Sequence, residues 1–118
     1  MCQPGDLVMV PFPFSDQDVT KKRPVLVLTI PDGRGDFVGL AVTSVPTVQC
    51  ALEVDNHSII AGSLPKRSWL RIDKIFSLNT RLVEGIFAQV SPAFRFLAVQ
   101  EICNILAPDA KGATRLAL

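Results

Sequence analysis

The sequence has no tyrosine, a single tryptophan and a single histidine, and its three cysteines, Cys2, Cys50 and Cys103, form no CxxC pair. An odd number of widely spaced cysteines argues against a disulfide framework and against a zinc site. We therefore expect the thiols to be small, mostly buried side chains in a reducing compartment. The one histidine, His57, follows Asn56 in a polar stretch, which indicates a solvated loop residue rather than a catalytic base.

Long hydrophobic runs are also missing. No apolar stretch approaches the roughly 20 residues that span a bilayer. The start of the chain lacks the basic segment and short apolar run that together form a signal peptide. We therefore expect a soluble, cytoplasmic protein without a membrane partner.

The composition suits one folded domain. The 118 residues are 48% hydrophobic and 19% charged, which is enough apolar material for one core. No repeat, linker or low-complexity segment divides the chain. We predict a single domain over residues 1–118, with a core at about 5–106 and a C-terminal tail at 107–118.

A strong excess of one charge is absent as well, because the net charge is only +1. This balance argues against broad, sequence-independent binding of nucleic acid. The basic residues are nevertheless grouped along the chain, at Lys21–Arg23 and Lys66–Arg67, with Arg71 and Lys74 close behind. Such grouping predicts a local basic patch on the surface.

Short apolar segments bounded by glycine and proline predict β-strands. The first runs from Asp6 to Val10. The second, from Pro24 to Ile30, is apolar nearly throughout, which indicates burial on both faces. Between them, the polar stretch Ser15–Lys22 predicts an exposed loop, and the turn residues of Pro31–Asp36 predict a hairpin tip. Further strands are predicted at Phe37–Val45, Ala51–Asp55 and Ser68–Leu78 (with a bend near Lys74–Phe76), and within Leu82–Val90.

The spacing of apolar residues changes after Val90. Ser91 suits a helix N-cap, and Pro92 suits the first helical position, where its missing N–H costs nothing. Apolar residues at helical spacing then predict a helix from Pro92 to Leu106. Its buried face would hold Phe94, Ala98, Ile102 and Ile105. The stretch Asn56–Arg67 contains Gly62 and Pro65 and is predicted to be irregular. Together these elements predict a mainly β fold, a strongly curved antiparallel sheet or barrel with one helix packed against it.

Three segments of the chain resemble the MazF/PemK toxin family. The first is Gly5–Leu28, which reads GDLVMVPFPF, then a polar loop, then KRPVLVL. The second is the Thr43-Ser44 pair that ends AVTS, and the third is WLRIDKIFSL at Trp69–Leu78. They follow one another in the order that the family has, and the resemblance covers most of Gly5–Leu106. Its specific part is the combination of Gly-Asp, Pro-Phe and Arg-Pro-Val-Leu-Val.

This resemblance implies an SH3-like barrel with a C-terminal α-helix, assembled as a homodimer. It implies the toxin of a type II toxin–antitoxin system, neutralised by a cognate antitoxin protein whose disordered segment folds onto the dimer. The implied activity is that of an endoribonuclease, an mRNA interferase. Such an enzyme cleaves single-stranded RNA at short sequences, without metal or other cofactor, to 2′,3′-cyclic phosphate and 5′-hydroxyl ends. An arginine and a threonine act in the family's cleavage, and they match Arg23 and Thr43 here.

The chemistry of these two side chains suits the reaction. The planar guanidinium of Arg23 can hold two phosphate oxygens and offset the charge that develops on them. The hydroxyl of Thr43 can bond a phosphate oxygen or pass a proton to the departing 5′-oxygen. Each also has an ordinary explanation, a strand-edge salt bridge for Arg23 and a β-branched strand residue for Thr43. The candidate RNA-binding residues are Lys21, Lys22, Ser44 and Lys74, and for the lysines the alternative is surface solubility.

Aromatic side chains offer further contacts, and two other functions stay open. Phe12, Phe14 and Trp69 could stack on bases, although Trp69 suits a dimer or antitoxin interface equally well. The first alternative function is a toxin of the same fold that binds a protein, as the gyrase-poisoning CcdB relatives do. The second is a non-enzymatic SH3-like module that binds a peptide, but this chain has no tyrosine for such a groove. In the first alternative Arg23 and Thr43 would be structural.

Overall fold

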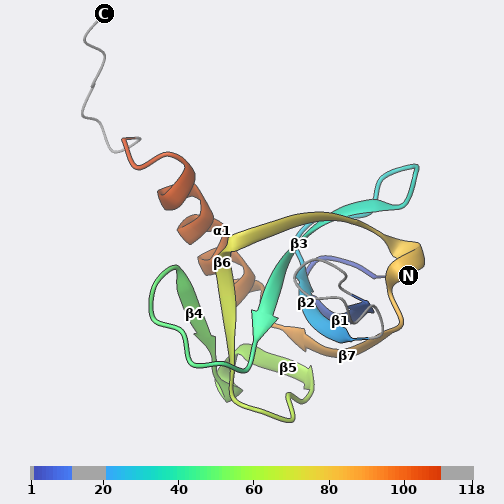
Figure 1. The fold of residues 1–118 in the computed structure, drawn as a ribbon, viewed down its shortest axis with the longest axis horizontal. Helices are drawn as coiled ribbons and strands as arrows, with labels where there is room; N and C mark the ends of the chain where they lie inside the picture. The colour runs from blue at the N-terminus through green and yellow to red at the C-terminus, as the bar shows by residue number, and fades with distance from the viewer. Residues whose placement is uncertain (1, 12–20, 110–118) are drawn as a thin grey trace, which may run out of the picture.

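The described part of the chain folds into one antiparallel sheet of seven strands followed by a single α-helix (Figure 1). The computed structural model describes residues 2–11 and 21–109. The strands are β1 (Asp6–Pro11), β2 (Lys22–Val27), β3 (Asp36–Thr43), β4 (Ala51–Val54), β5 (Ile59–Gly62), β6 (Ser68–Asn79) and β7 (Gly85–Val90). The helices are the 3-10 helices η1 (Asn56–Ser58) and η2 (Thr80–Leu82) and the α-helix α1 (Pro92–Leu106).

The strands lie in the order β4-β6-β3-β2-β1-β7-β5, and every neighbouring pair is antiparallel. The sheet curls into a half-barrel, with the long strand β6 bending across its top in Figure 1. The prediction of a mainly β fold, with a curved antiparallel sheet and a C-terminal helix, is confirmed.

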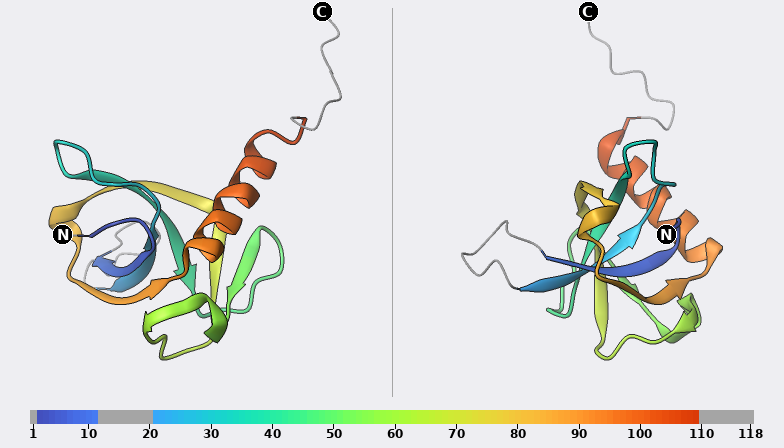
Figure 2. Two further views of the ribbon diagram at one scale, coloured as in Figure 1. Left: turned by 180° about the vertical axis from the view of Figure 1, so that it is seen from behind. Right: turned by 90° about the vertical axis from the view of Figure 1, so that its right-hand side faces the viewer.

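Helix α1 begins where the sequence predicted. The Ser91 side chain accepts a hydrogen bond from the Phe94 backbone N–H at 3.1 Å, which caps the first turn. Phe94 and Ala98 are buried and Ile102 is packed against the same core, but Ile105 is exposed. The reason is visible in Figure 2, where the second half of α1 projects beyond the sheet. The predicted apolar face of the helix is therefore confirmed except at Ile105.

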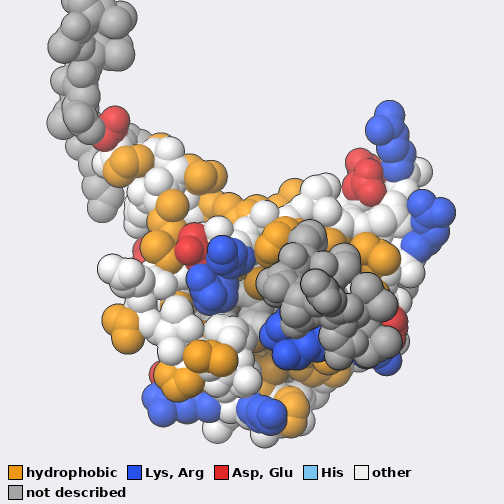
Figure 3. Space-filling view, in the orientation of Figure 1, with side chains coloured by type: hydrophobic (Ala, Val, Ile, Leu, Met, Phe, Trp, Pro, Cys, Tyr) orange, Lys and Arg blue, Asp and Glu red, His pale blue; other side chains and the backbone are white. Residues whose placement is uncertain are grey.

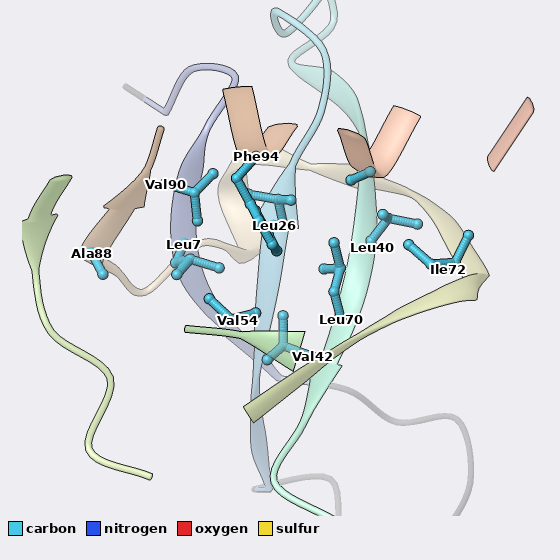
Figure 4. Packing of buried hydrophobic residues seen from close by; sticks show 11 residues of the cluster. Leu7, Leu26, Leu40, Val42, Val54, Leu70, Ile72, Ala88, Val90 and Phe94 are labelled. Atoms are coloured by element: carbon cyan, nitrogen blue, oxygen red, sulfur yellow. The ribbon is translucent and has the colours of Figure 1, made fainter. Parts of the chain in front are cut away.

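Strand β2 lies at the centre of the sheet and Val25–Val27 are buried on both faces, as predicted, but the strand ends at Val27, and Thr29 and Ile30 at the end of the predicted strand are exposed. Leu26 belongs to the larger apolar cluster, in which it lies beside Phe94 of the helix (Figure 4). Val25 and Val27 belong to a second cluster on the opposite face of the strand. All three side chains have no exposed surface. Burying each stabilises the fold by about 1.5–3 kcal/mol.

The stretch Asn56–Arg67 is more regular than predicted, because it contains η1 and β5. Strand β5 has only four residues, three of them exposed, and it pairs only with β7 at the sheet edge. Such a strand has no inward-facing apolar row, so the alternation that marks a strand in the sequence is missing. The predicted bend in β6 is found, with irregular pairing between Leu70 and Ile75 opposite Ala41.

The expected burial of the cysteines is wrong for two of the three. Cys2 is buried, and burial raises the pKa of its thiol, whereas Cys50 and Cys103 are exposed. All three have free thiols. No helix in the described part of the chain is long and apolar enough to cross a bilayer.

Several predictions fall wholly or partly outside the described residues. Phe12, Phe14 and all of the predicted loop Ser15–Lys22 except Lys21 and Lys22 lie there, as does the tail from residue 110 onward. The division into a core at 5–106 and a tail stays a prediction.

Gly62 at the end of β5 provides a test of this fold. Its φ is +70°, and a Cβ there would collide with the Phe87 carbonyl oxygen and lie 2.8 Å from Cα of Ala88. Gly62→Ala should lower the free energy of unfolding by about 1–3 kcal/mol, since a left-handed backbone alone costs alanine about 1–2 kcal/mol. The matched control is Gly33→Ala, whose Cβ would meet nothing within 4 Å. Equal denaturation midpoints for the two variants would contradict the placement of β5.

Candidate functional site

A groove with a volume of about 770 Å³ lies where β2 begins and β3 ends. Three segments of the chain border it: Lys21–Pro24, Val42–Val45 and Ser63–Lys66. Met9 of β1, Ser68 of β6 and Phe87 of β7 complete its lining. The groove thus gathers residues that are far apart in the sequence, from both halves of the sheet.

The groove brings together most of the residues that the sequence predicted for a site. Lys21, Lys22, Arg23, Thr43 and Ser44 all line it. Lys74, in the irregular part of β6, is exposed and does not line it. His57 is an exposed residue of η1, in agreement with the solvated position expected for it.

Strand register explains why Arg23 and Thr43 lie at the same end of the β2–β3 pair. Strands β2 and β3 pair with Val25 opposite Ala41 and Leu26 opposite Leu40. Continued by two residues, this register brings Arg23 opposite Thr43. Side chains of residues opposite each other in an antiparallel pair point to the same face. Both residues are half-buried at the mouth formed by the two strand ends.

The hydroxyl group of Thr43 is held in place by a backbone N–H two residues further along the chain. Its Oγ1 accepts a hydrogen bond from the Val45 N–H at 3.1 Å. A threonine hydroxyl can accept and also donate one hydrogen bond. The contact with Val45 therefore orients the oxygen and leaves its proton available for a ligand in the groove.

The described lining of the groove is basic and neutral. It contains the cations of Lys21, Lys22, Arg23 and Lys66, and no aspartate, glutamate or histidine. Lys22 also forms an ion pair with Glu84 at 2.7 Å, in which both side chains are about half exposed. Such a pair is worth about 0–1 kcal/mol, so an anion in the groove can compete for Lys22. In the described ranges, no three side chains of the kind that ligate metals come together.

Residues 63–66 and Ser68 were not predicted as part of the site. The sequence showed the basic pair Lys66-Arg67, but it did not predict strand β5, which places Lys66 in the groove. Ser68 is buried, and its hydroxyl donates to the Lys66 carbonyl oxygen at 2.9 Å. In Figure 3, basic side chains occur at the centre and along the lower edge of this face, over β6 and β5 and beside the residues drawn in grey.

Arg67 has surroundings different from those of Lys66. Its guanidinium lies 5.2 Å from the centroid of the Trp69 ring and donates to both carboxylate oxygens of Glu53. The hydrogen bond from Arg67 lowers the pKa of the Glu53 carboxyl. Trp69 is half-buried on β6, where it pairs with Thr43 of β3. Arg67 therefore belongs to the wall beside the groove and does not line it.

Solved structures with the same architecture identify the fold. A chain of the MazE–MazF complex from Deinococcus radiodurans matches with a TM-score of 0.72, over 90% of this chain and 96% of its own, at 20% identity. The Mycobacterium tuberculosis toxin MazF-mt6 matches with a TM-score of 0.65, over 86% and 95%, at 14% identity. A mycobacterial endoribonuclease in complex with its cognate antitoxin gives 0.60, over 97% and 99%, at 16% identity. No protein-family model and no curated protein matches the sequence. The chain therefore has the fold of the MazF toxins.

Proposed function

We propose that the chain is a toxin of the MazF/PemK family and a metal-independent endoribonuclease that cleaves single-stranded RNA in the groove between β2 and β3. The observation that carries this proposal is that Arg23 and Thr43 line one groove whose described lining has no acidic residue. The fold supports it, since solved chains of this fold include one called an endoribonuclease and others called MazF toxins.

The reaction breaks one P–O bond and makes another. The 2′-oxygen loses its proton and attacks the neighbouring phosphorus, the bond to the 5′-oxygen breaks, and that oxygen leaves with a proton. The products are a 2′,3′-cyclic phosphate and a 5′-hydroxyl, and no electrons are transferred to or from the protein. The described groove residues include no carboxylate or imidazole, so we assign no side chain to removal of the 2′-proton.

Arg23 acts on the charge that accumulates on the phosphate oxygens. Its guanidinium stays protonated at any working pH and can donate two parallel hydrogen bonds to two oxygens. A donor held where charge develops is worth about 3–4 kcal/mol of barrier. Arg23 lies at the start of a buried strand, which limits the movement of its backbone. Such a donor must be held in place to act on the developing charge.

Thr43 donates a hydrogen bond to an oxygen of the scissile phosphate group. With its Oγ1 already accepting from Val45, the hydroxyl proton can be donated to a phosphate oxygen or to the departing 5′-oxygen. The adjacent Ser44, together with Lys21 and Lys22, supplies further donors for the phosphates on either side. Lys74 lies outside the groove, so it could contact only an RNA strand that extends beyond the groove.

Apolar residues in the groove favour an unpaired strand as substrate. Met9, Val42, Leu64 and Phe87 line the same space as the cations. Apolar and aromatic surfaces accept bases that are unstacked, which single-stranded RNA can present and a duplex cannot without opening.

A homodimer and a cognate antitoxin complete the proposal. One matching structure is an endoribonuclease in complex with its cognate antitoxin, and others are MazE–MazF structures. In this chain, α1 exposes Phe96, Leu97 and Leu106, with exposed fractions of 63%, 42% and 69%. Large exposed apolar side chains on one element are typical of a surface that contacts another protein. No observation favours the protein-binding toxin or the peptide-binding module over RNA cleavage.

The first prediction concerns Arg23. Purified protein should cut single-stranded RNA in EDTA to 2′,3′-cyclic phosphate and 5′-hydroxyl ends. Arg23→Ala should lower kcat by about 10²–10³-fold, as removal of a donor to developing charge does elsewhere. Arg23→Lys should recover only part of the loss, because an ammonium lacks the two-pronged geometry. The control is Arg34→Ala, at the exposed hairpin tip, where Arg34 bonds other described residues only through its backbone atoms. Full activity of a folded Arg23→Ala variant would refute the role.

The second prediction concerns the Thr43 hydroxyl. Thr43→Val keeps the shape of the side chain and removes the donor, so kcat should fall by at least about tenfold, whereas Thr43→Ser should retain most activity. Thr29→Val is the matched control, because Thr29 Oγ1 also accepts from a backbone N–H (Val38, 2.9 Å) but is outside the groove. Single-turnover cleavage rates compare the four proteins. Equal rates for Thr43→Val and Thr29→Val would contradict a chemical role for Thr43.

A further inference from the structure

The connection between β5 and β6 places a cation in the groove that belongs to neither of the two catalytic strands. Residues Ser63–Lys66 line the groove together with the start of β2 and the end of β3. The groove therefore has basic residues from two distant parts of the chain, Lys21–Arg23 and Lys66. A nucleic acid strand that fills the groove meets both.

Lys66 and Arg67 are adjacent cations in different electrostatic situations. The charge of Arg67 is already engaged, by Glu53 and by the face of Trp69. In the part of the chain that the structure describes, the ammonium of Lys66 has no ion-pair or hydrogen-bond partner. Of these two cations, Lys66 lines the groove and Arg67 does not. An anion in the groove would gain a contact with Lys66 without displacing a carboxylate.

The backbone that carries Lys66 is held on both sides. Ser68 is 5% exposed and its hydroxyl bonds the Lys66 carbonyl oxygen at 2.9 Å. Pro65, directly before Lys66, has a φ angle fixed by its own ring. Gly62 packs against the backbone of Phe87 and Ala88. The base of the Lys66 side chain is thus fixed, while its exposed end can adjust to a phosphate.

We propose that Lys66 binds a backbone phosphate of the RNA that flanks the scissile one, and that it contributes to substrate affinity rather than to the chemical step. This inference rests on the proposed RNA cleavage. An ammonium is a compact charge without the two-pronged geometry of a guanidinium, so it suits a phosphate that changes little during the reaction. Each phosphate that a cation neutralises makes the slope of log K against log salt steeper, so a contact with Lys66 should be measurable in that slope.

The test measures binding and catalysis separately. A cleavage site is first mapped on a long RNA, and an oligonucleotide spanning it is made with a 2′-deoxy nucleotide at the scissile position, so that it binds but is not cut. Its Kd is measured over a series of salt concentrations for the wild type, Lys66→Ala, Lys66→Gln and Arg67→Ala. Cleavage of the all-RNA oligonucleotide gives kcat and KM for the same proteins.

Both Lys66 variants should weaken binding by about fivefold near 0.1 M salt and reduce the slope of log K against log salt by about 0.7. Their KM should rise while kcat stays within about twofold of the wild type. Arg67→Ala should keep the slope of the wild type. Unchanged slopes in folded Lys66 variants, or an equal loss in Arg67→Ala, would overturn the inference while cleavage by the wild type persists. A wild-type protein that cuts no RNA would overturn the proposed function itself, and with it this inference.

Discussion

Burial of β2 on both faces is the constraint that holds the groove together. Val25, Leu26 and Val27 have no exposed surface, and they alternate between two apolar clusters on opposite sides of the strand. A slip of one residue would send each side chain to the wrong cluster, so the register against β3 has no low-energy alternative. That register in turn places Arg23 and Thr43 at the same end of the two strands, where both line the groove. The position of the candidate chemistry thus depends on hydrophobic packing a few residues away.

Four basic side chains of this protein are grouped at one site, although the net charge is close to zero. The net charge of +1 gave little indication of an anion-binding surface. Glu53 is paired with Arg67 beside the groove, and Glu84 is paired with Lys22 of the lining, but neither carboxylate lines the groove itself. All charged side chains in the described lining of the groove are cations. A cleft with one sign of charge concentrates oppositely charged ligands even when the whole molecule is nearly neutral.

The sequence predicted the parts of the fold that have strong local signals. The apolar run of β2, the Ser91-Pro92 start of α1 and the turn before Asp36 each have a physical cause within a few residues. Strand β5 lacks such a signal, because an exposed edge strand of four residues is held by its pairing with β7 rather than by its own pattern. The site likewise has parts that the sequence predicted and parts that it did not. The family motif predicted Arg23 and Thr43. Lys66 reaches the groove only through β5, and the projection of α1 beyond the sheet depends on tertiary structure, so neither had a local signal in the sequence.

The most direct test of the account is a structure of the protein with a single-stranded RNA that carries a 2′-deoxy nucleotide at the cleavage position. We expect the scissile phosphate to lie in the groove between β2 and β3, with its oxygens about 2.7–3.2 Å from the Arg23 guanidinium and from Thr43 Oγ1. RNA bound on another face of the half-barrel, or a scissile phosphate out of reach of both side chains, would contradict it.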